Sequence, residues 1–325
     1  MKSAAVAALS LAAVLVLAVT FGSDAAPLAD AIAGRGYART ILLDVRLPTA
    51  LLAALAGAGL ASSGAAFQAV LRNPLAEPYV LGVSGGAALG ATLVIALGLG
   101  ASTPLGAALT PLAAFAGGLA ATALVDRVAR GGRGASSGAS MLLAGVMVNS
   151  IAAALITVAK VLAPPARTKD MLRWLVGFVE LPSPLALGLT ALYVALGTAL
   201  LVREAPALNL LALGDDSAAA LGVDVPRLER RVLFASSLAV GAVVSVTGLI
   251  GFVGLVVPHV LRRTVGPDLR RLLPLSLLVG ASALVGCDLV ARVAFGLVGT
   301  KLPVGAVTAL VGGPLFLRLL ARGGR

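Results

Sequence analysis

The sequence predicts an all-α, polytopic membrane protein with about ten transmembrane helices, and three observations lead to this fold class. Hydrophobic residues make up 59% of the 325-residue chain and charged residues only 12%, about half the charge that a soluble domain carries. The mean hydropathy is +1.04. The apolar residues form long runs rich in Ala, Leu, Val and Gly, without strand-like alternation, and each is long enough for one helical crossing of a bilayer.

We treat residues 1–325 as a single transmembrane domain with nine clear apolar runs. The first run follows Lys2 and could pass for a signal peptide. Its apolar part is longer than that of a signal peptide and many runs follow it, so we interpret it as a transmembrane helix. The predicted crossings are residues 4–22, 49–71, 79–99, 104–125, 141–163, 184–202, 231–251, 272–291 and 302–320.

A tenth crossing is predicted from the positions of the basic residues, because Lys and Arg are enriched in the cytoplasmic connections of membrane proteins. Nine crossings would put the two termini on opposite sides and divide the arginine clusters. A short hidden crossing at about 248–261 places both termini and most of the arginines in the cytoplasm. The arginines assigned to that side include Arg127, Arg130, Arg133, Arg203, Arg227, Arg230, Arg231, Arg262, Arg263, Arg270, Arg271, Arg318, Arg322 and Arg325.

The composition argues against several other classes of protein. The net charge of +11 comes from basic residues that stand singly or in threes without interleaved aromatics, which is unlike a nucleic-acid-binding surface. Cys287 and His259 are the only residues of their kinds, so neither an internal disulfide nor a metal site is predicted. No phosphate-binding loop, His-Glu-x-x-His motif or Ser-His-Asp set can be assembled, so we do not expect an enzyme.

Two classes of transporter fit these observations, and they differ in their source of energy. An ion-coupled secondary transporter or channel would need no ATP and no partner, but it would normally carry ionisable residues at mid-membrane. Lys160 lies close to the end of its run, and Asp288 and Arg292 are spaced to pair with each other. With no proton relay and no nucleotide site, a separate ATPase is the favoured source, and the ion-coupled transporter or channel is the alternative.

Residues 203–230 form the largest predicted cytoplasmic loop. Asp215 and Asp216 suit the first turn of a short helix, and Gly222 suits its end. From the residues alone, this helix is either a docking element for a partner or a mere connector.

Small residues recur at helical spacing within one predicted crossing. Gly82, Gly86 and Gly90 are four residues apart, a spacing that lets helix backbones approach closely in lipid. We interpret them as helix-packing residues and assign them no contact with a substrate.

Several blocks of sequence carry a family resemblance. They follow one another from about residue 40 to the C-terminus and comprise Arg46-Leu47-Pro48, residues 72–78, 81–87, 143–145, 212–222, 251–259 and 302–310. In content and order they resemble the permeases of the FecCD type, the ABC importers for ferric siderophores, haem and cobalamin. The Arg-Asn-Pro-Leu-Ala and Gly-Leu-Val-Val-Pro-His blocks are the most specific.

The resemblance implies a type II ABC importer permease of ten helices in a bacterial cytoplasmic (inner) membrane. Such permeases work as homodimers, with two ATP-binding-cassette ATPase subunits on the cytoplasmic side and a substrate-binding protein outside. The pathway lies between the two copies. ATP and Mg would be bound by the ATPase, and no cofactor by this chain. A ferric siderophore is the first substrate expectation, followed by cobalamin and haem.

The resemblance also implies roles for individual residues. Arg46 and Arg292 match outer-surface arginines that dock the binding protein, and Asn73, Gly138 and Ala139 match cytoplasmic gate positions. Thr49 and Lys301 depart from the family pattern, where Arg and Glu are frequent. The segment that would couple the permease to its ATPase consists of Gly214, Asp215, Asp216, Ser217, Ala218, Leu221 and Gly222.

Overall fold

The computed structural model describes residues 2–22, 36–99, 104–131, 138–295 and 299–323. Seven helices among these residues are long and apolar enough to cross a membrane, and α5 and α15 are shorter apolar helices. The predicted all-α membrane fold is therefore confirmed. In chain order the elements are α1 (Lys2–Thr20), α3 (Ala38–Thr40), the π-helix η1 (Ile41–Arg46), α4 (Leu47–Val70), the 3₁₀ helix η2 (Pro78–Leu81), α5 (Val83–Leu97), α6 (Pro104–Gly131), α7 (Gly138–Leu162), α8 (Pro165–Val176), α9 (Pro184–Leu211), α10 (Asp215–Ala220), α11 (Val225–Thr247), α12 (Val253–Val265), α13 (Leu269–Val293) and α15 (Val304–Gly323).

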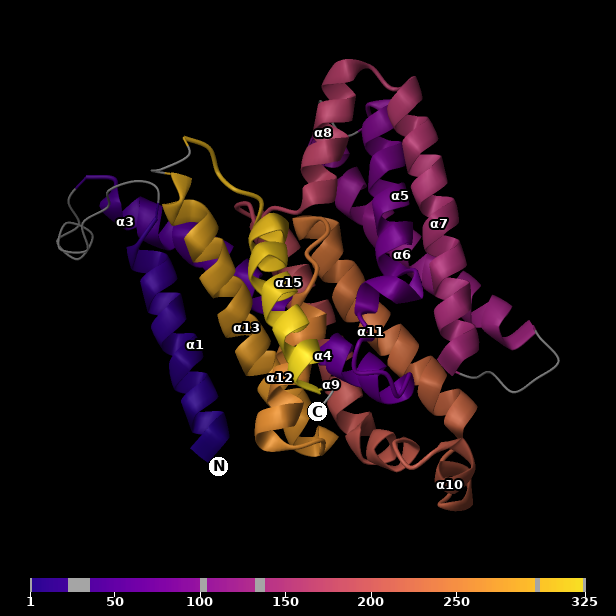
Figure 1. Cartoon of the computed structure of the whole chain (residues 1–325). Coiled ribbons are helices and arrows are strands. Elements are labelled where there is room, and N and C mark those ends of the chain that lie inside the picture. Colours follow the sequence, from indigo (N-terminus) through magenta and orange to yellow (C-terminus); the bar gives the residue numbers. More distant parts are fainter. Residues whose placement is uncertain (1, 23–35, 100–103, 132–137, 296–298, 324–325) are drawn as a thin grey trace.

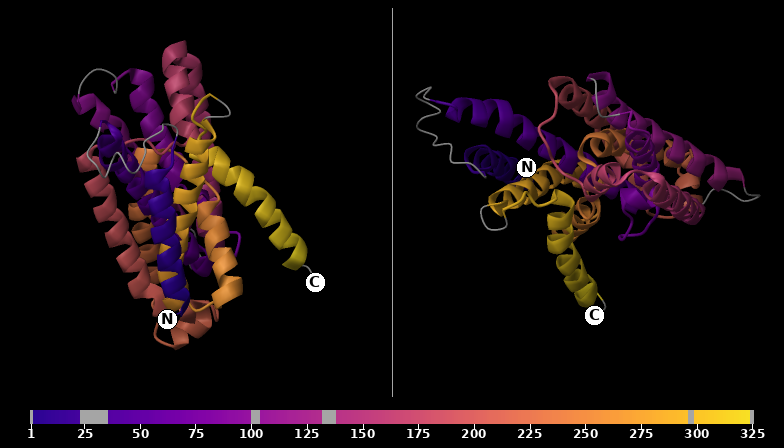
Figure 2. Two further views of the ribbon diagram at one scale, coloured as in Figure 1. Left: turned by 90° about the vertical axis from the view of Figure 1, so that its left-hand side faces the viewer. Right: turned by 90° about the horizontal axis from the view of Figure 1, so that it is seen from above.

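The helices form an elongated bundle with two distinct ends (Figure 1). The start of α1 lies at the same end as α10 and the α12–α13 connection, whereas α3 and α8 lie at the opposite end. We call these the α10 end and the α8 end. α15 projects away from the bundle in both views of Figure 2, and its contacts are with α13, α12 and α8. Of the arginines assigned to the cytoplasm, Arg133 and Arg325 lie outside the described residues.

Helix boundaries at both ends of the bundle differ from the prediction. The expected loop 203–230 is mostly helical, because α9 continues to Leu211 and α11 begins at Val225, which leaves α10 and two short connections. An ion pair of 3.2 Å between Glu204 and Arg231 joins the extended ends, and the apolar residues beside it are buried. At the α8 end, residues 38–46 continue α4 backward into one helical stretch, since Ala38 and Leu42 pack against Val19 of α1.

Helix α4 lies at the centre and packs closely on its neighbours through small residues. A Cβ added to Gly57 would collide with the carbonyl of Gly280 on α13, and one added to Gly64 would collide with the carbonyl of Gly254 on α12. Such backbone-to-backbone contact replaces the hydrophobic driving force that is missing between helices in lipid.

The stretch expected to contain a hidden crossing, 248–261, holds a break followed by a short helix. After α11 the backbone is non-helical over residues 248–252, and α12 then leads back to the α10 end. The stretch predicted as the tenth crossing thus consists of five non-helical residues followed by the 13 residues of α12. Phe252, at the junction, has φ +69°, a left-handed conformation that a bulky side chain rarely adopts.

Side chains from the α4–η2 segment satisfy the backbone of this break. The Tyr79 hydroxyl donates to the Ile250 carbonyl (2.6 Å) and accepts from the Ile250 N–H (2.7 Å). Glu77 accepts from the Phe252 N–H (2.6 Å), and the Gln68 amide donates to the Leu255 carbonyl (3.1 Å). Non-helical backbone is tolerated at membrane depth only where protein groups supply such bonds.

A second break interrupts the predicted crossing 79–99. Gly82 has φ +90° and separates η2 from α5, so the expectation of one continuous helix through Gly82 is wrong. The 15 residues of α5 span only about 22 Å, less than the hydrocarbon thickness. Gly86 and Gly90 lie further along α5, directly against the backbone of α6 at Gly117 and Ala113.

We expect Gly64→Ala to destabilise the protein by about 2 kcal/mol, because the new methyl group overpacks the contact of α4 with α12. Gly286→Ala on α13 is the matched control, since nothing lies within 4 Å of its added Cβ. Unfolding in mixed detergent micelles, followed by intrinsic fluorescence, measures both. Equal stability of the two variants would contradict the close contact.

Candidate functional sites at the two ends of the bundle

A pocket of about 270 Å³ at the α8 end carries three basic side chains, Arg46, Arg292 and Lys301. They come from η1, the end of α13 and the segment before α15, so positions far apart in the sequence meet here. The rest of the wall is mostly apolar and consists of Gly22, Ile41, Val45, Thr49, Leu181 and Phe295.

The two arginines of this pocket are anchored on the last turn of α1. Arg46 donates from Nη1 to the carbonyls of Val19 (3.2 Å) and Thr20 (2.8 Å), and Arg292 donates from Nη1 to the carbonyl of Ala18 (3.0 Å). The last carbonyls of a helix have no partner within it and carry partial negative charge. Both arginines therefore cap α1.

Arg292 also forms a buried ion pair with Asp288 one turn earlier on α13. Its Nε lies 2.9 Å from the carboxylate, whose side chain is fully buried. The spacing of four residues predicted this pairing, and the structure confirms the contact.

Lys301 completes the basic wall. Its ammonium donates to the Val179 carbonyl, and burial lowers the pKa of Lys301 while the nearby Asp288 carboxylate acts in the opposite direction. Because Asp288 already pairs with Arg292, the pocket keeps an excess of positive charge. A pocket of this kind can accept a carboxylate or another anionic group by charge-assisted hydrogen bonds.

The predicted docking residues thus line one pocket, but they are less accessible than outer-surface arginines. Arg46 is 5% and Arg292 8% exposed. Thr49 lies beside them and donates its hydroxyl to the Val45 carbonyl (2.7 Å). Sequence reasoning missed that both arginines cap α1, and it did not group Lys301 with them.

The predicted coupling segment lies at the α10 end. Gly214 has φ +109° and precedes α10, whose first turn contains Asp215 and Asp216, and Gly222 has φ +88° just after it. Ala218 is fully buried against the bundle, whereas Leu213 and Leu221 on either side of α10 are exposed. α10 therefore offers a short rigid surface with apolar ends.

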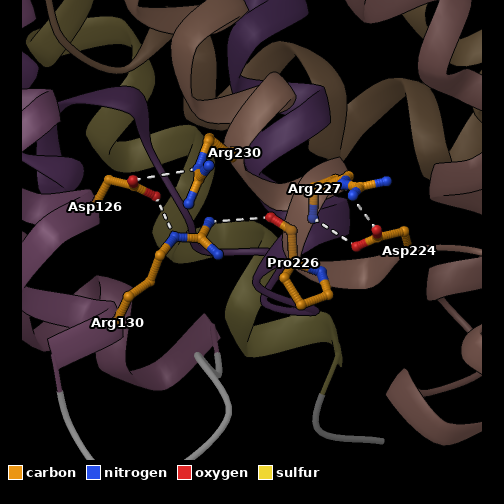
Figure 3. A network of polar contacts seen from close by, with 6 residues as sticks. All are labelled: Asp126, Arg130, Asp224, Pro226, Arg227 and Arg230. Carbon is orange, nitrogen blue, oxygen red and sulfur yellow. Dashed lines mark hydrogen bonds and ion pairs between the residues drawn. The ribbon is translucent and has the colours of Figure 1, made fainter.

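An ionic network beside α10 ties α6 to α11 (Figure 3). Asp126 of α6 contacts Arg130 (2.6 Å) and Arg230 of α11 (3.4 Å), and Arg130 also donates to the Pro226 carbonyl (3.0 Å). The prediction did not include Asp126, although its spacing of four residues from Arg130 is the signal that could have found it.

The predicted gate residues lie in two different settings. Asn73, in the turn after α4, accepts from the Leu75 N–H (2.9 Å) through its side chain. Gly138 and Ala139 open the first turn of α7 and so lie at a helix start rather than in a loop. Across the described ranges, no group of three or more His, Cys, Asp or Glu could hold a metal ion.

A polytopic helical bundle with two broken crossings, a basic pocket at one end and a short exposed helix at the other is the architecture of a membrane permease. The chain belongs to the FecCD transport family, whose model matches residues 10–322. It is therefore the permease component of an ABC importer, as the sequence predicted, and not the ion-coupled transporter or channel that was the alternative. Such permeases operate with an ATPase and a substrate-binding protein.

Named relatives and a solved structure agree with this assignment. The chain is 39% identical to the hemin transport system permease protein HmuU of Yersinia pestis, over 87% of this chain and 83% of that protein. It is 40% identical to the vitamin B12 import system permease protein BtuC of Vibrio cholerae, with the same coverage of each. A metal-chelate type ABC transporter solved in an inward-facing conformation superposes with a TM-score of 0.85, 30% identity and 98% coverage of both chains.

We expect Asp288→Asn to destabilise the protein by about 3 kcal/mol, because it leaves the buried Arg292 without its counter-charge. Glu180→Gln is the control, since it breaks the Arg173–Glu180 pair, whose side chains are 66% and 54% exposed and which contributes about 1 kcal/mol or less. Unfolding in mixed micelles compares them. Similar losses for both variants would show that the Asp288–Arg292 pair is not buried as described.

Proposed function

We propose that this permease forms the path for ATP-driven import of a metal chelate or corrinoid, with a ferric siderophore first and cobalamin or haem next. The single observation that supports it most is the family match along almost the whole chain. Two relatives are named as permeases for hemin and vitamin B12, and the solved structure of the same fold is named as a metal-chelate transporter. All three names refer to large chelates.

The two ends of the bundle suit two different partners. The short surface of α10, flanked by Leu213 and Leu221, suits insertion into a groove of an ATPase. The basic pocket suits carboxylates of a substrate-binding protein, for which complementary charge speeds association. This arrangement puts the α10 end and both termini in the cytoplasm, in accord with the arginine distribution, and the α8 end outside.

A second copy of the chain supplies the other wall of the path in this proposal. Apolar side chains along α7 are largely exposed, and α15 projects from the bundle with apolar residues such as Leu310 uncovered. These surfaces face either lipid or the partner copy. In the proposal, the permease binds no cofactor of its own, and ATP and Mg reside on the ATPase.

We expect replacement of residues 214–222 by a flexible Gly/Ser linker of equal length to abolish uptake by the reconstituted complex, because a rigid element is needed to pass on ATPase closure. The permease should melt within a few degrees of the wild type, since α10 makes few contacts with the bundle. Uptake is measured in proteoliposomes, and full uptake by the variant would contradict a coupling role.

We expect Arg46→Gln, alone or with Lys301→Gln, to weaken binding of the substrate-binding protein about tenfold, by loss of a charge-assisted contact. The effect should be larger at low salt, where screening is weakest. Arg39→Gln is the control, because Arg39 is exposed at the same end but outside the pocket. Titration by surface plasmon resonance measures the affinity, and unchanged binding would reject this docking surface.

A further inference from the structure

The turn after α4 contains a residue in a conformation that its type disfavours. Arg72 has φ +47°, at the position following a helix where Gly is the usual residue. Its N–H bonds to the Ala69 carbonyl (3.2 Å), and the next N–H, of Asn73, bonds to the Gln68 carbonyl (3.2 Å). An L-residue held in left-handed backbone is a reason to look for a role of its side chain.

That side chain reaches the coupling segment. The Arg72 Nη2 lies 3.0 Å and 2.9 Å from the two carboxylate oxygens of Asp215, the first residue of α10. Both side chains are about 40% exposed, at 40% and 43%. An exposed ion pair of this kind adds little to the free energy of unfolding. Its main effect is therefore geometric, because it joins α10 to the end of α4.

The same turn is joined to the break in the tenth crossing. Gln68, whose backbone carbonyl holds the Arg72 turn, donates its side-chain amide to the carbonyl of Leu255 (3.1 Å) at the start of α12. Three residues earlier, the Phe252 side chain lies against Gly312 of α15, so that a Cβ on Gly312 would collide with it. Direct contacts therefore lead from α10 through the end of α4 to α12 and α15.

We propose that Arg72 is the positioning residue that makes α10 and the end of α4 move as one body, and so delivers ATPase closure to the break at 248–252 and to α15. This inference rests on the proposed docking of an ATPase at α10. The Asp126 network, by contrast, joins the start of α11 to α6 and does not touch Asp215.

Arg72→Gly separates this role from a structural one. Glycine suits the left-handed turn, so the variant should melt at or above the wild-type temperature. We expect ATPase affinity and ATP hydrolysis to stay within about twofold, whereas uptake per ATP hydrolysed falls about tenfold. The test uses the full complex with its binding protein in proteoliposomes. The probe is a radio-iron ferric siderophore or radio-cobalt cobalamin, whichever the wild type accumulates.

Two further variants control for charge and for pairing. Arg227→Gln removes one cationic side chain near α10 whose ion pair, with Asp224 (3.1 Å), stays within its own segment, and it should leave uptake per ATP within about twofold. Arg72→Asp should abolish coupling, and adding Asp215→Arg should restore much of it by re-forming the pair in reverse. A double variant no better than Arg72→Asp would overturn the proposal.

The other outcomes are equally decisive. Unchanged uptake per ATP in Arg72→Gly would overturn the inference, and so would a loss of ATPase affinity in that variant, which would make Arg72 a docking residue instead. If the wild-type complex assembles without contact between α10 and the ATPase, the proposed function itself is contradicted. This inference is then contradicted as well. Cross-linking from Leu221 to the ATPase detects that case before any Arg72 variant is tested.

Discussion

A chain that unwinds inside a membrane must find new partners for its backbone N–H and C=O groups, and the rest of this structure depends on how residues 248–252 find theirs. Gln68, Glu77 and Tyr79 bond to backbone groups between Ile250 and Leu255. These side chains reach the backbone groups only because Gly64 and Gly254 let α4 and α12 approach to backbone contact. At this break, the hydrogen bonds to the backbone therefore depend on the close packing of α4 against α12.

Tyr79 connects this break with the one before α5. Its hydroxyl holds both backbone groups of Ile250, while its carbonyl accepts from Asn149 of α7 (2.7 Å) and from Ser84 (3.1 Å). The break at 248–252 and the break before α5 are thus joined to each other by the hydrogen bonds of Tyr79. We expect movement at the periphery of the bundle, because α15 has few neighbours there.

Composition and charge placement were enough to predict the fold class, because lipid allows few architectures and the basic residues report the side of each connection. The long α9 and α11 were not predictable, since Glu204 and Arg231 pair only after the two helices lie side by side. Resemblance pointed to Arg46 and Arg292, but their bonds to α1 join distant positions that no local pattern reveals. The same holds for Arg72, whose conformation is visible only in the folded backbone.

The bond from Arg292 to the Ala18 carbonyl joins positions 274 residues apart, and this has a consequence for biogenesis. Helix α1 therefore lacks one of its caps until the end of α13 has been synthesised. Until then α1 has its contacts with η1 and α4, which include the bonds from Arg46.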